Sequence, residues 1–390
     1  MLTNNIKLKQ FKVKIKKKNI SQYLNFLINE KNQVINSLTK NYKNNFKRKN
    51  LLKYKKFSDF RIIGMGGSTL GTQAIYDFLK SKIKKNFLFI DNLQSSKRKK
   101  DRTKYLNLVV SKSGNTLETI LNSNILINNK QKSIFITENK KSYLNTLAHK
   151  LKSDIIHHNN YIGGRYSVLS EVGMLPAELM GLNISKFKQL NNLIKNKKYI
   201  NYLVNNVEAI LHFIKIKKFN SIIINYDEKS TNLFNWYQQL VAESLGKKSK
   251  GILPVISNMP KDNHSVMQLY LDGFRKNFFT FFYVKEKNSI KISNNKILSS
   301  NTYLKNKNLD KIIFAQKNAT ENVFNKKNIP FRTFEINKRD EKTLGELFTF
   351  FILETILIGR ALKINPFDQP SVELIKTETK KFLVSNKFQK

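Results

Sequence analysis

The chain from about residue 56 onward alternates short apolar runs with segments of helical period. The apolar runs lie at 60–63, 87–90, 106–110, 133–137 and 154–156. The helix-period segments between them lie at 69–82, 115–127 and 142–152. Strands that alternate with helices in this way are typical of a parallel sheet covered by helices on both faces. The pattern therefore predicts an α/β fold.

A second cycle of the same kind begins after Lys198. It opens with a predicted strand at 221–225 and a predicted helix at 231–246. The further predicted elements are strands at 278–284, 311–314 and 331–336, and helices at 343–362 and 371–383. We therefore predict two domains of similar build, each a parallel sheet between helices. The first covers residues 56–198, and the second covers residues 199–390 and includes the C-terminal helices.

Residues 1–55 differ from the rest of the chain in their pattern of polar and apolar residues. They are polar, with one apolar stripe at 23–28 that fits a helix face, and they predict an N-terminal helical extension. Near the N-terminus, the apolar residues Ile6 and Leu8 alternate with lysines, which is unlike the continuous apolar region of a signal peptide. We therefore expect the protein to be cytoplasmic.

The longest apolar segment, at 344–362, raises the question of a membrane span. It carries the charged residues Glu346, Glu354 and Arg360. Charges inside a span of that length favour a buried core helix over a bilayer-crossing one. We therefore expect no membrane partner.

The composition limits the chemistry that the chain can perform. The 390 residues are 40% hydrophobic, which is enough for substantial cores, and they include no Cys, which excludes disulfides and thiol chemistry. The five His residues show no metal-site spacing, and His157 and His158 are adjacent, so that on a strand they would face opposite ways. We therefore predict no metal site.

The formal net charge of +44 invites comparison with nucleic-acid-binding proteins. Lys dominates the basic residues, and these residues are spread from Lys7 to Lys390 among many Asn and Ile. Such a distribution indicates solvated faces rather than one binding surface, so we expect no nucleic-acid partner. The positive field would still draw in an anionic substrate.

Two turns follow neighbouring predicted strands in the first cycle. Residues 64–71, GMGGSTLG, come directly after the run at 60–63, and residues 111–116, SKSGNT, come directly after the run at 106–110. Neither turn fits a dinucleotide fingerprint or a Walker loop. The first, taken alone, equally fits a plain tight turn. The second carries three hydroxyls, at Ser111, Ser113 and Thr116, which is more than one helix cap uses. Together they predict a site for a phosphate ester at the ends of the strands.

Further polar segments could supply reactive groups. Arg165 follows two glycines, and Gln239 and Glu243 are one helical turn apart and share a face. His264 lies in a polar loop, and Lys376 lies in a helix that follows the segment FDQP. Each residue also has a plain interpretation as a surface or loop residue, and only the ordered set argues for a site.

The ordered set of motifs resembles the glucose-6-phosphate isomerase family, one of the sugar-isomerase-domain folds. The resemblance runs from about residue 56 to 383. The motifs that carry it are GMGGSTLG (64–71), SKSGNTLET (111–119), GGRYS (163–167), the stretch 239–247, the His264 loop and FDQPSVELIK (367–376).

The resemblance implies an enzyme that interconverts glucose 6-phosphate and fructose 6-phosphate in glycolysis and gluconeogenesis, through ring opening and an enediolate. It implies no cofactor, and a homodimer with shared active sites. It also implies a substrate-binding set composed of Gly67, Ser68, Ser111, Lys112, Ser113, Thr116 and Gln239.

The family's reacting groups map to four further residues. By the resemblance, Glu243 is the base that moves a proton between C2 and C1, and Arg165 stabilises the enediolate. His264 and Lys376 are the pair implied for ring opening. These residue types suit the chemistry, since a carboxylate can take a proton beside a carbonyl and Arg stays charged beside the oxyanion.

Three alternatives remain open at this point. The SGNT sequence is also seen in bifunctional phosphoglucose/phosphomannose isomerases and in regulators built on the same domain. A non-catalytic sugar-phosphate-binding protein would be expected to lack the Glu or the Arg, and both are present. A nucleic-acid binder would show a steep salt dependence of binding.

Overall fold

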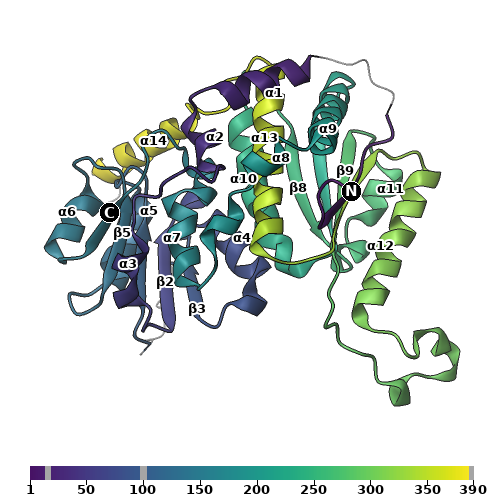
Figure 1. Ribbon diagram of the computed structural model, residues 1–390, viewed down its shortest axis with the longest axis horizontal. Helices are drawn as coiled ribbons and strands as arrows, with labels where there is room; N and C mark the ends of the chain where they lie inside the picture. Colours follow the sequence, from purple (N-terminus) through teal and green to yellow (C-terminus); the bar gives the residue numbers. More distant parts are fainter. Residues whose placement is uncertain (14–18, 97–102, 386–390) are drawn as a thin grey trace.

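Two five-stranded sheets organise the structure, a computed structural model that describes residues 1–13, 19–96 and 103–385 (Figure 1). The first sheet has the order β3-β2-β4-β5-β6, and all its strands are parallel. Its strands are β2 (Asp59–Gly64), β3 (Asn86–Ile90), β4 (Leu106–Val110), β5 (Ser133–Thr137) and β6 (Asp154–His157). The five apolar runs of the first cycle are thus strands of one sheet, as predicted.

Helices connect and cover these strands. They are α4 (Leu70–Phe78), α5 (Leu117–Leu126), α6 (Tyr143–Lys150) and α7 (Glu171–Leu179). Every residue of the central strand β4 is buried, which explains why it is a continuous apolar run in the sequence.

The second sheet has the order β1-β10-β9-β7-β8. Its strands are β1 (Ile6–Lys9), β7 (Asn220–Asn225), β8 (Leu253–Asn258), β9 (Asn277–Val284) and β10 (Phe331–Ile336). The strands β10, β9, β7 and β8 are parallel, whereas β1 pairs with β10 in the antiparallel direction. The fold is α/β, with parallel sheets flanked by helices, and only this edge strand departs from the parallel pattern among the described residues.

Two of the predicted segments differ from the structure. Residues 311–314, predicted as a strand, belong to α12 (Leu309–Lys326), whose first turn is capped when the Asn308 side chain accepts from the Lys311 N–H at 3.0 Å. The N-terminal segment contains α1 (Ile20–Asn29), α2 (Gln33–Ser37) and α3 (Arg48–Leu51), but it also contributes β1 to the second sheet. It is therefore not helical throughout.

The remaining helices are α8 (Leu190–Leu193), α9 (Lys197–Lys215), α10 (Thr231–Leu245), α11 (Met267–Asp272), α13 (Glu341–Ala361) and α14 (Val372–Val384). Two of them, α10 and α13, join the two sheets. Helix α10 packs against both α4 and α13, and α13 is buried along nearly its whole length between the two halves (Figure 1). One apolar cluster runs from Phe60 of β2 through Trp236 and Phe348 to Phe278 of β9. This shared core holds the two sheets in one arrangement.

The apolar segment at 344–362 is thus a core helix, as its internal charges predicted. Glu354 accepts a hydrogen bond from the Asn206 side chain at 2.6 Å and pairs with the buried Arg332. Within the described residues, no helix combines the length and the apolar character that a bilayer crossing requires.

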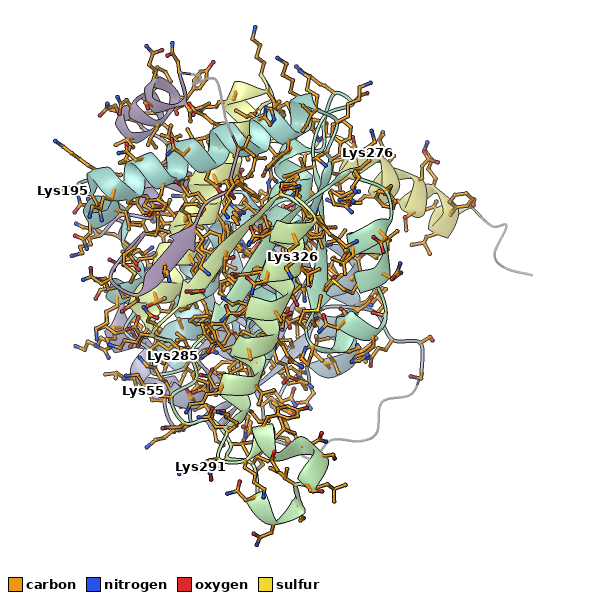
Figure 2. All side chains as sticks on the ribbon, turned by 90° about the vertical axis from the view of Figure 1, so that its right-hand side faces the viewer. Lys55, Lys195, Lys276, Lys285, Lys291 and Lys326 are labelled. Carbon is orange, nitrogen blue, oxygen red and sulfur yellow. The ribbon has the colours of Figure 1, made fainter. Side chains whose placement is uncertain are left out.

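The basic residues are distributed over the surface. Figure 2 labels exposed lysines at separate places on one side of the molecule: Lys55, Lys195, Lys276, Lys285, Lys291 and Lys326. They lie on different segments of the chain rather than in one patch, so the positive field is diffuse.

Candidate active site

A cavity of about 390 Å³ lies where the first sheet meets α10 and the start of α14. The C-terminal ends of β2, β4 and β5 open toward it, which is where ligands bind in open α/β sheets. Most of the predicted site residues line it: Gly67, Ser68, Lys112, Ser113, Thr116, Arg165, Gln239, Glu243 and Lys376. The structure therefore brings together residues that are up to about 300 positions apart in the sequence.

The Gly-rich turn after β2 is shaped by close backbone contacts. A Cβ added at Gly67 would lie 2.3 Å from the carbonyl carbon of Gly164, so a side chain there would separate the two turns. Gly66 has a φ of +52°, and a Cβ there would lie 2.8 Å from Nε2 of Gln239. These glycines let the turn that carries Ser68 approach both the Arg165 segment and α10.

The hydroxyl-rich turn after β4 is held by its own hydrogen bonds. Ser111 Oγ and Thr116 Oγ1 are 2.9 Å apart, and Ser113 Oγ accepts from the Asn115 N–H at 3.2 Å. Ser113 and Thr116 line the cavity, whereas Ser111 is only 1% exposed and is not among the described lining residues. Ser111 thus contacts the turn from behind and orients the Thr116 hydroxyl.

Two lysines and a carboxylate stand at the same end of the cavity. Lys112 Nζ donates to the Asn160 carbonyl at 2.8 Å and lies 3.6 Å from Oε1 of Glu138. Lys140 pairs with the other oxygen of Glu138. Lys112, Lys140 and Glu138 all line the cavity, so the hydroxyl turn has two cations beside it. Lys140 was not predicted, because one Lys among many carries no signal in this sequence.

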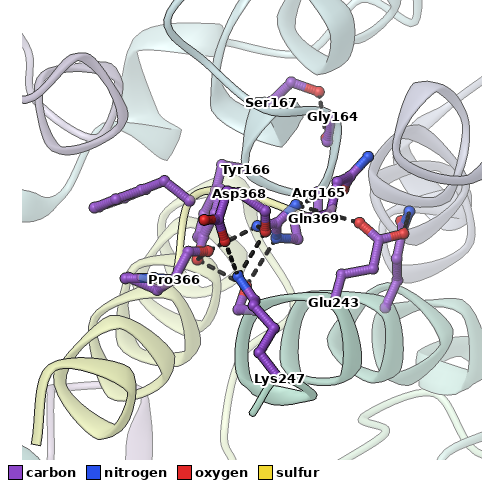
Figure 3. A network of polar contacts seen from close by, with 12 residues as sticks. Gly164, Arg165, Tyr166, Ser167, Glu243, Lys247, Pro366, Asp368 and Gln369 are labelled. Atoms are coloured by element: carbon purple, nitrogen blue, oxygen red, sulfur yellow. Dashed lines mark hydrogen bonds and ion pairs between the residues drawn. The ribbon is translucent and has the colours of Figure 1, made fainter. Parts of the chain in front are cut away.

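Arg165 is 1% exposed, and all three nitrogens of its guanidinium donate hydrogen bonds to other residues of the protein (Figure 3). Nε donates to Ser244 Oγ at 2.8 Å, and Nη1 donates to Gln369 Oε1 at 2.7 Å. Nη2 donates to the carbonyls of Pro366 at 2.7 Å and Asp368 at 3.0 Å.

The remaining Arg165 donor reaches Glu243, whose Oε2 lies 3.3 Å from Nη1. All five N–H groups of the guanidinium are thus engaged, which fixes its plane and its position. The contact to Glu243 is the longest of the five.

Helix α10 supplies the carboxylate of the site. Gln239 Nε2 donates to Glu243 Oε1 at 2.8 Å, a contact that their one-turn spacing on a shared helix face allows. The same helix holds the Arg165 segment, because Trp236 Nε1 donates to the Arg165 carbonyl at 3.1 Å. The Glu243 side chain keeps 26% of its surface exposed, so it faces the cavity while its oxygens are oriented.

Behind the guanidinium lies a buried hydroxyl pair. The Tyr166 and Ser244 hydroxyls are 2.8 Å apart, and Tyr166 also donates to the Pro366 carbonyl at 2.9 Å. Burial raises the pKa of Tyr166, so this hydroxyl keeps its proton. It acts as a fixed support for the loop that carries Pro366.

The two residues implied for ring opening are placed differently. Lys376 lines the cavity from α14 and pairs with Glu373 at 2.6 Å. His264 ends the short 3-10 helix η7 (Lys261–His264), is exposed, and is not among the described residues that line the cavity. Within a single chain, the structure therefore does not bring His264 to the other site residues.

The arrangement suits proton transfer on an anionic substrate. Hydroxyls and lysines line one cavity together with a carboxylate that stands beside a fixed guanidinium. Among the described residues, no cluster of three or more His, Asp or Glu side chains could hold a metal ion. Gln369, like Lys140, was left out of the site by sequence reasoning, although its motif FDQP was noted.

Comparisons with known proteins identify the family of the chain. The family model described as phosphoglucose isomerase matches residues 28–389. The chain belongs to the phosphoglucose isomerase family. A glucose-6-phosphate isomerase of Methanocaldococcus jannaschii is 32% identical over an alignment of 352 residues, which covers 83% of this chain and 84% of the relative. A glucose-6-phosphate isomerase of Mycoplasmopsis pulmonis is 34% identical over 83% of this chain and 82% of the relative.

Two solved structures share this fold. A hypothetical protein from Thermus thermophilus superposes with a TM-score of 0.82 at 23% identity and covers 94% of both chains. A glucose-6-phosphate isomerase from Chlamydia trachomatis gives a TM-score of 0.70 at 20% identity, over 86% of this chain and 72% of that one. At these identities the likeness concerns the fold.

Proposed function

We propose that this member of the phosphoglucose isomerase family interconverts glucose 6-phosphate and fructose 6-phosphate. The observation that carries the proposal is the Arg165–Glu243 pair, at 3.3 Å, in one cavity with the hydroxyl turn of Ser113 and Thr116. A carboxylate, a cation and a phosphate cradle are the groups that an aldose–ketose isomerisation of a sugar phosphate requires.

The phosphate is assigned to the end of the cavity with the two turns. Ser68, Ser113 and Thr116 offer hydroxyl donors there, and Lys112 and Lys140 offer charge. The phosphate does not react. Its binding energy holds the open-chain sugar so that the proton transfer is well oriented.

The proton transfer is assigned to Glu243. Its carboxylate takes the C2 proton of open-chain glucose 6-phosphate. The electrons of that C–H bond form the C1–C2 double bond, and the carbonyl electrons of C1 move onto O1, which gives the enediolate. Return of the proton to C1, with transfer of the O2 hydroxyl proton to O1, gives fructose 6-phosphate. The fixed guanidinium of Arg165 stabilises the charge on the enediolate oxygen, because it is already oriented before the charge develops.

The proposal includes a homodimer in which His264 of one subunit completes the site of its partner. Two observations support it. His264 is exposed and is not among the described lining residues of its own cavity. Helix α14, which carries Lys376, buries none of its residues and exposes Leu374 (69%) and Ile375 (71%), as a helix would that packs against a second copy. The cytoplasmic location and the lack of a cofactor remain predictions.

A coupled assay with purified protein and no added metal tests the reaction. We expect fructose 6-phosphate to be converted to glucose 6-phosphate, and a chain without turnover would refute the proposal.

Subunit mixing tests the shared site. Inactive His264→Ala and inactive Glu243→Gln chains, once mixed and exchanged, should regain part of the activity, because one of the two sites in each hybrid dimer has both residues intact. A fully active monomer, or no recovery after confirmed exchange, would exclude the shared site.

A further inference from the structure

The loop 365–369 supplies most of the acceptors that fix the Arg165 guanidinium. The carbonyls of Pro366 and Asp368 and the side chain of Gln369 accept three of its five hydrogen bonds. Any shift of this loop would therefore turn or displace the guanidinium. What holds the loop in place then decides where the positive charge of the site lies.

Lys247 holds this loop from the side of α10 (Figure 3). Its Nζ donates to the Asp368 carbonyl and to Asp368 Oδ1, each at 2.6 Å, and also to the Asn365 carbonyl. The Lys247 side chain is only 11% exposed. The hydrogen bond and the charge of Lys247 lower the pKa of Asp368, so this carboxylate stays ionised in the pair.

The position of Lys247 links the loop to the base. It lies four residues after Glu243, just beyond the end of α10 at Leu245. The Asp368 carbonyl accepts from both Lys247 and Arg165, at 2.6 and 3.0 Å. One carbonyl therefore joins the end of the helix that carries Glu243 to the guanidinium that stands beside Glu243.

We propose that Lys247 is a positioning residue for Arg165, which it acts on through the loop 365–369. The inference rests on the proposed function, in which Arg165 stabilises the enediolate. An exposed ion pair between Lys247 and Asp368 would contribute little to the stability of the loop. Lys247 instead is largely buried and binds two backbone carbonyls of the loop, so it restrains the backbone and not only a side chain.

The proposal predicts a selective defect. A shift of about 1 Å in a group that acts on the transition state can lower a rate about 100-fold while leaving ground-state binding intact. The phosphate end of the cavity is formed by the turns after β2 and β4, which Lys247 does not contact in the described structure. Loss of Lys247 should therefore lower kcat and spare KM.

The test compares Lys247→Met with Lys250→Met. Lys250 follows in the same segment and donates to the Leu362 carbonyl at 3.0 Å, so it makes the same kind of bond to the end of α13 but not to the loop 365–369. We expect Lys247→Met to lower kcat about 10- to 100-fold with KM for fructose 6-phosphate changed less than twofold. Lys250→Met should match the parent chain in both.

Two inhibitors make the readout specific to the guanidinium. A phosphorylated hydroxamic acid mimics the planar, charged enediolate, and a phosphorylated alditol mimics the neutral open-chain sugar. Lys247→Met should weaken binding of the hydroxamic acid by the same factor as kcat/KM and leave binding of the alditol unchanged. Asp368→Asn, which keeps the carbonyl and removes only the charged partner, should show the same selectivity to a smaller extent.

The outcomes separate the two claims. If Lys247→Met keeps kcat within twofold of an active parent, or loses affinity for both inhibitors equally, Lys247 does not position Arg165 and the proposed reaction still stands. If the parent itself shows no turnover, the proposed function fails first. Should Lys247→Met not fold, as judged by its melting temperature, Asp368→Asn decides, and an unselective Asp368→Asn variant overturns the inference.

Discussion

Replacing Glu243 by Gln tests the centre of the mechanism. The change keeps the shape of the side chain and removes the base. In the structure, Glu243 Oε1 accepts from Gln239 at 2.8 Å and Oε2 accepts from Arg165 at 3.3 Å. An amide can offer an acceptor to only one of these donors, because its nitrogen must face the other.

The magnitudes separate an effect on folding from an effect on the rate. The contact of Glu243 with Arg165 is long, and the guanidinium keeps its other acceptors, so we expect the free energy of unfolding to fall by about 1–3 kcal/mol, the cost of leaving one buried donor unsatisfied. General base catalysis contributes roughly 10²–10⁴-fold. At about 1.4 kcal/mol for each factor of ten, the barrier should rise by about 3–5 kcal/mol.

The assay measures turnover and proton exchange together. Glu243→Gln should lower kcat at least about 100-fold. It should also stop the exchange of the C2 proton of glucose 6-phosphate with deuterated solvent. KM should change little, because the turns that hold the phosphate are untouched. Glu228→Gln, the same acid-to-amide change in an exposed residue just before α10, serves as the control and should behave as the parent chain.

One result would refute this reasoning. If folded Glu243→Gln kept near-normal turnover or solvent exchange, another group would be the base and the role taken from the family would be wrong. A large rise in KM with unchanged kcat would instead assign Glu243 to substrate binding.

Further substitutions test the other parts of the site and the fold. Replacing both Ser113 and Thr116 by Ala should raise KM for fructose 6-phosphate at least about tenfold with kcat less affected, since a hydrogen bond to a charged group contributes about 1.5–3 kcal/mol; an unchanged KM would move the phosphate elsewhere. Arg165→Lys should lower kcat about 100-fold or more, measured in the same assay, because an ammonium cannot satisfy the acceptors around the guanidinium. Burial acts to raise the pKa of Glu335, but Lys317 and Lys9 outweigh it and lower that pKa to about 2. The interaction of Glu335 with these lysines therefore stabilises the fold fully above about pH 4.5 and less as the pH falls toward 2. Lys317→Met should therefore lower the free energy of unfolding by about 3–5 kcal/mol at neutral pH, as measured by urea titration, and the deficit should shrink between pH 4.5 and 2; a deficit independent of pH would contradict the assignment.

The sequence predicted the first sheet well because each strand there is a buried apolar run between helices. It missed β8, where Pro254 argues against a strand interior. The structure explains this, because β8 is an edge strand of its sheet. It also assigned 311–314 to a strand, since a run of four residues is too short to show a period.

The candidate site was predictable where glycines, hydroxyls or a one-turn spacing gave a pattern. Gly67, Ser113 and the Gln239–Glu243 pair are such cases, and all of them line the cavity. Lys140 and Lys247 were not predictable from composition, because Lys is so abundant that no single one stands out. Their significance comes from the partners that the fold brings to them, Glu138 and the loop 365–369.

The strand β1 has a consequence for how the chain can be shortened. It covers the outer edge of β10, where Phe334 and Ile336 alternate with polar residues. Without β1, the backbone N–H and C=O groups along that edge would be unpaired and could pair with another chain. Nearby, the Thr3 hydroxyl donates to the buried Glu346 carboxylate, 343 residues away in the sequence.

A chain that starts near residue 56, at the boundary that the sequence pattern suggests, would keep every group of the cavity described above and still expose this edge. Lys7 and Lys9, which pair with Glu335 and Glu321 across it, would be lost with the strand. Charges of that kind on an edge strand oppose sheet-to-sheet association. Removing the N-terminal segment is therefore expected to lower the solubility of the protein, although all the groups of the cavity are kept.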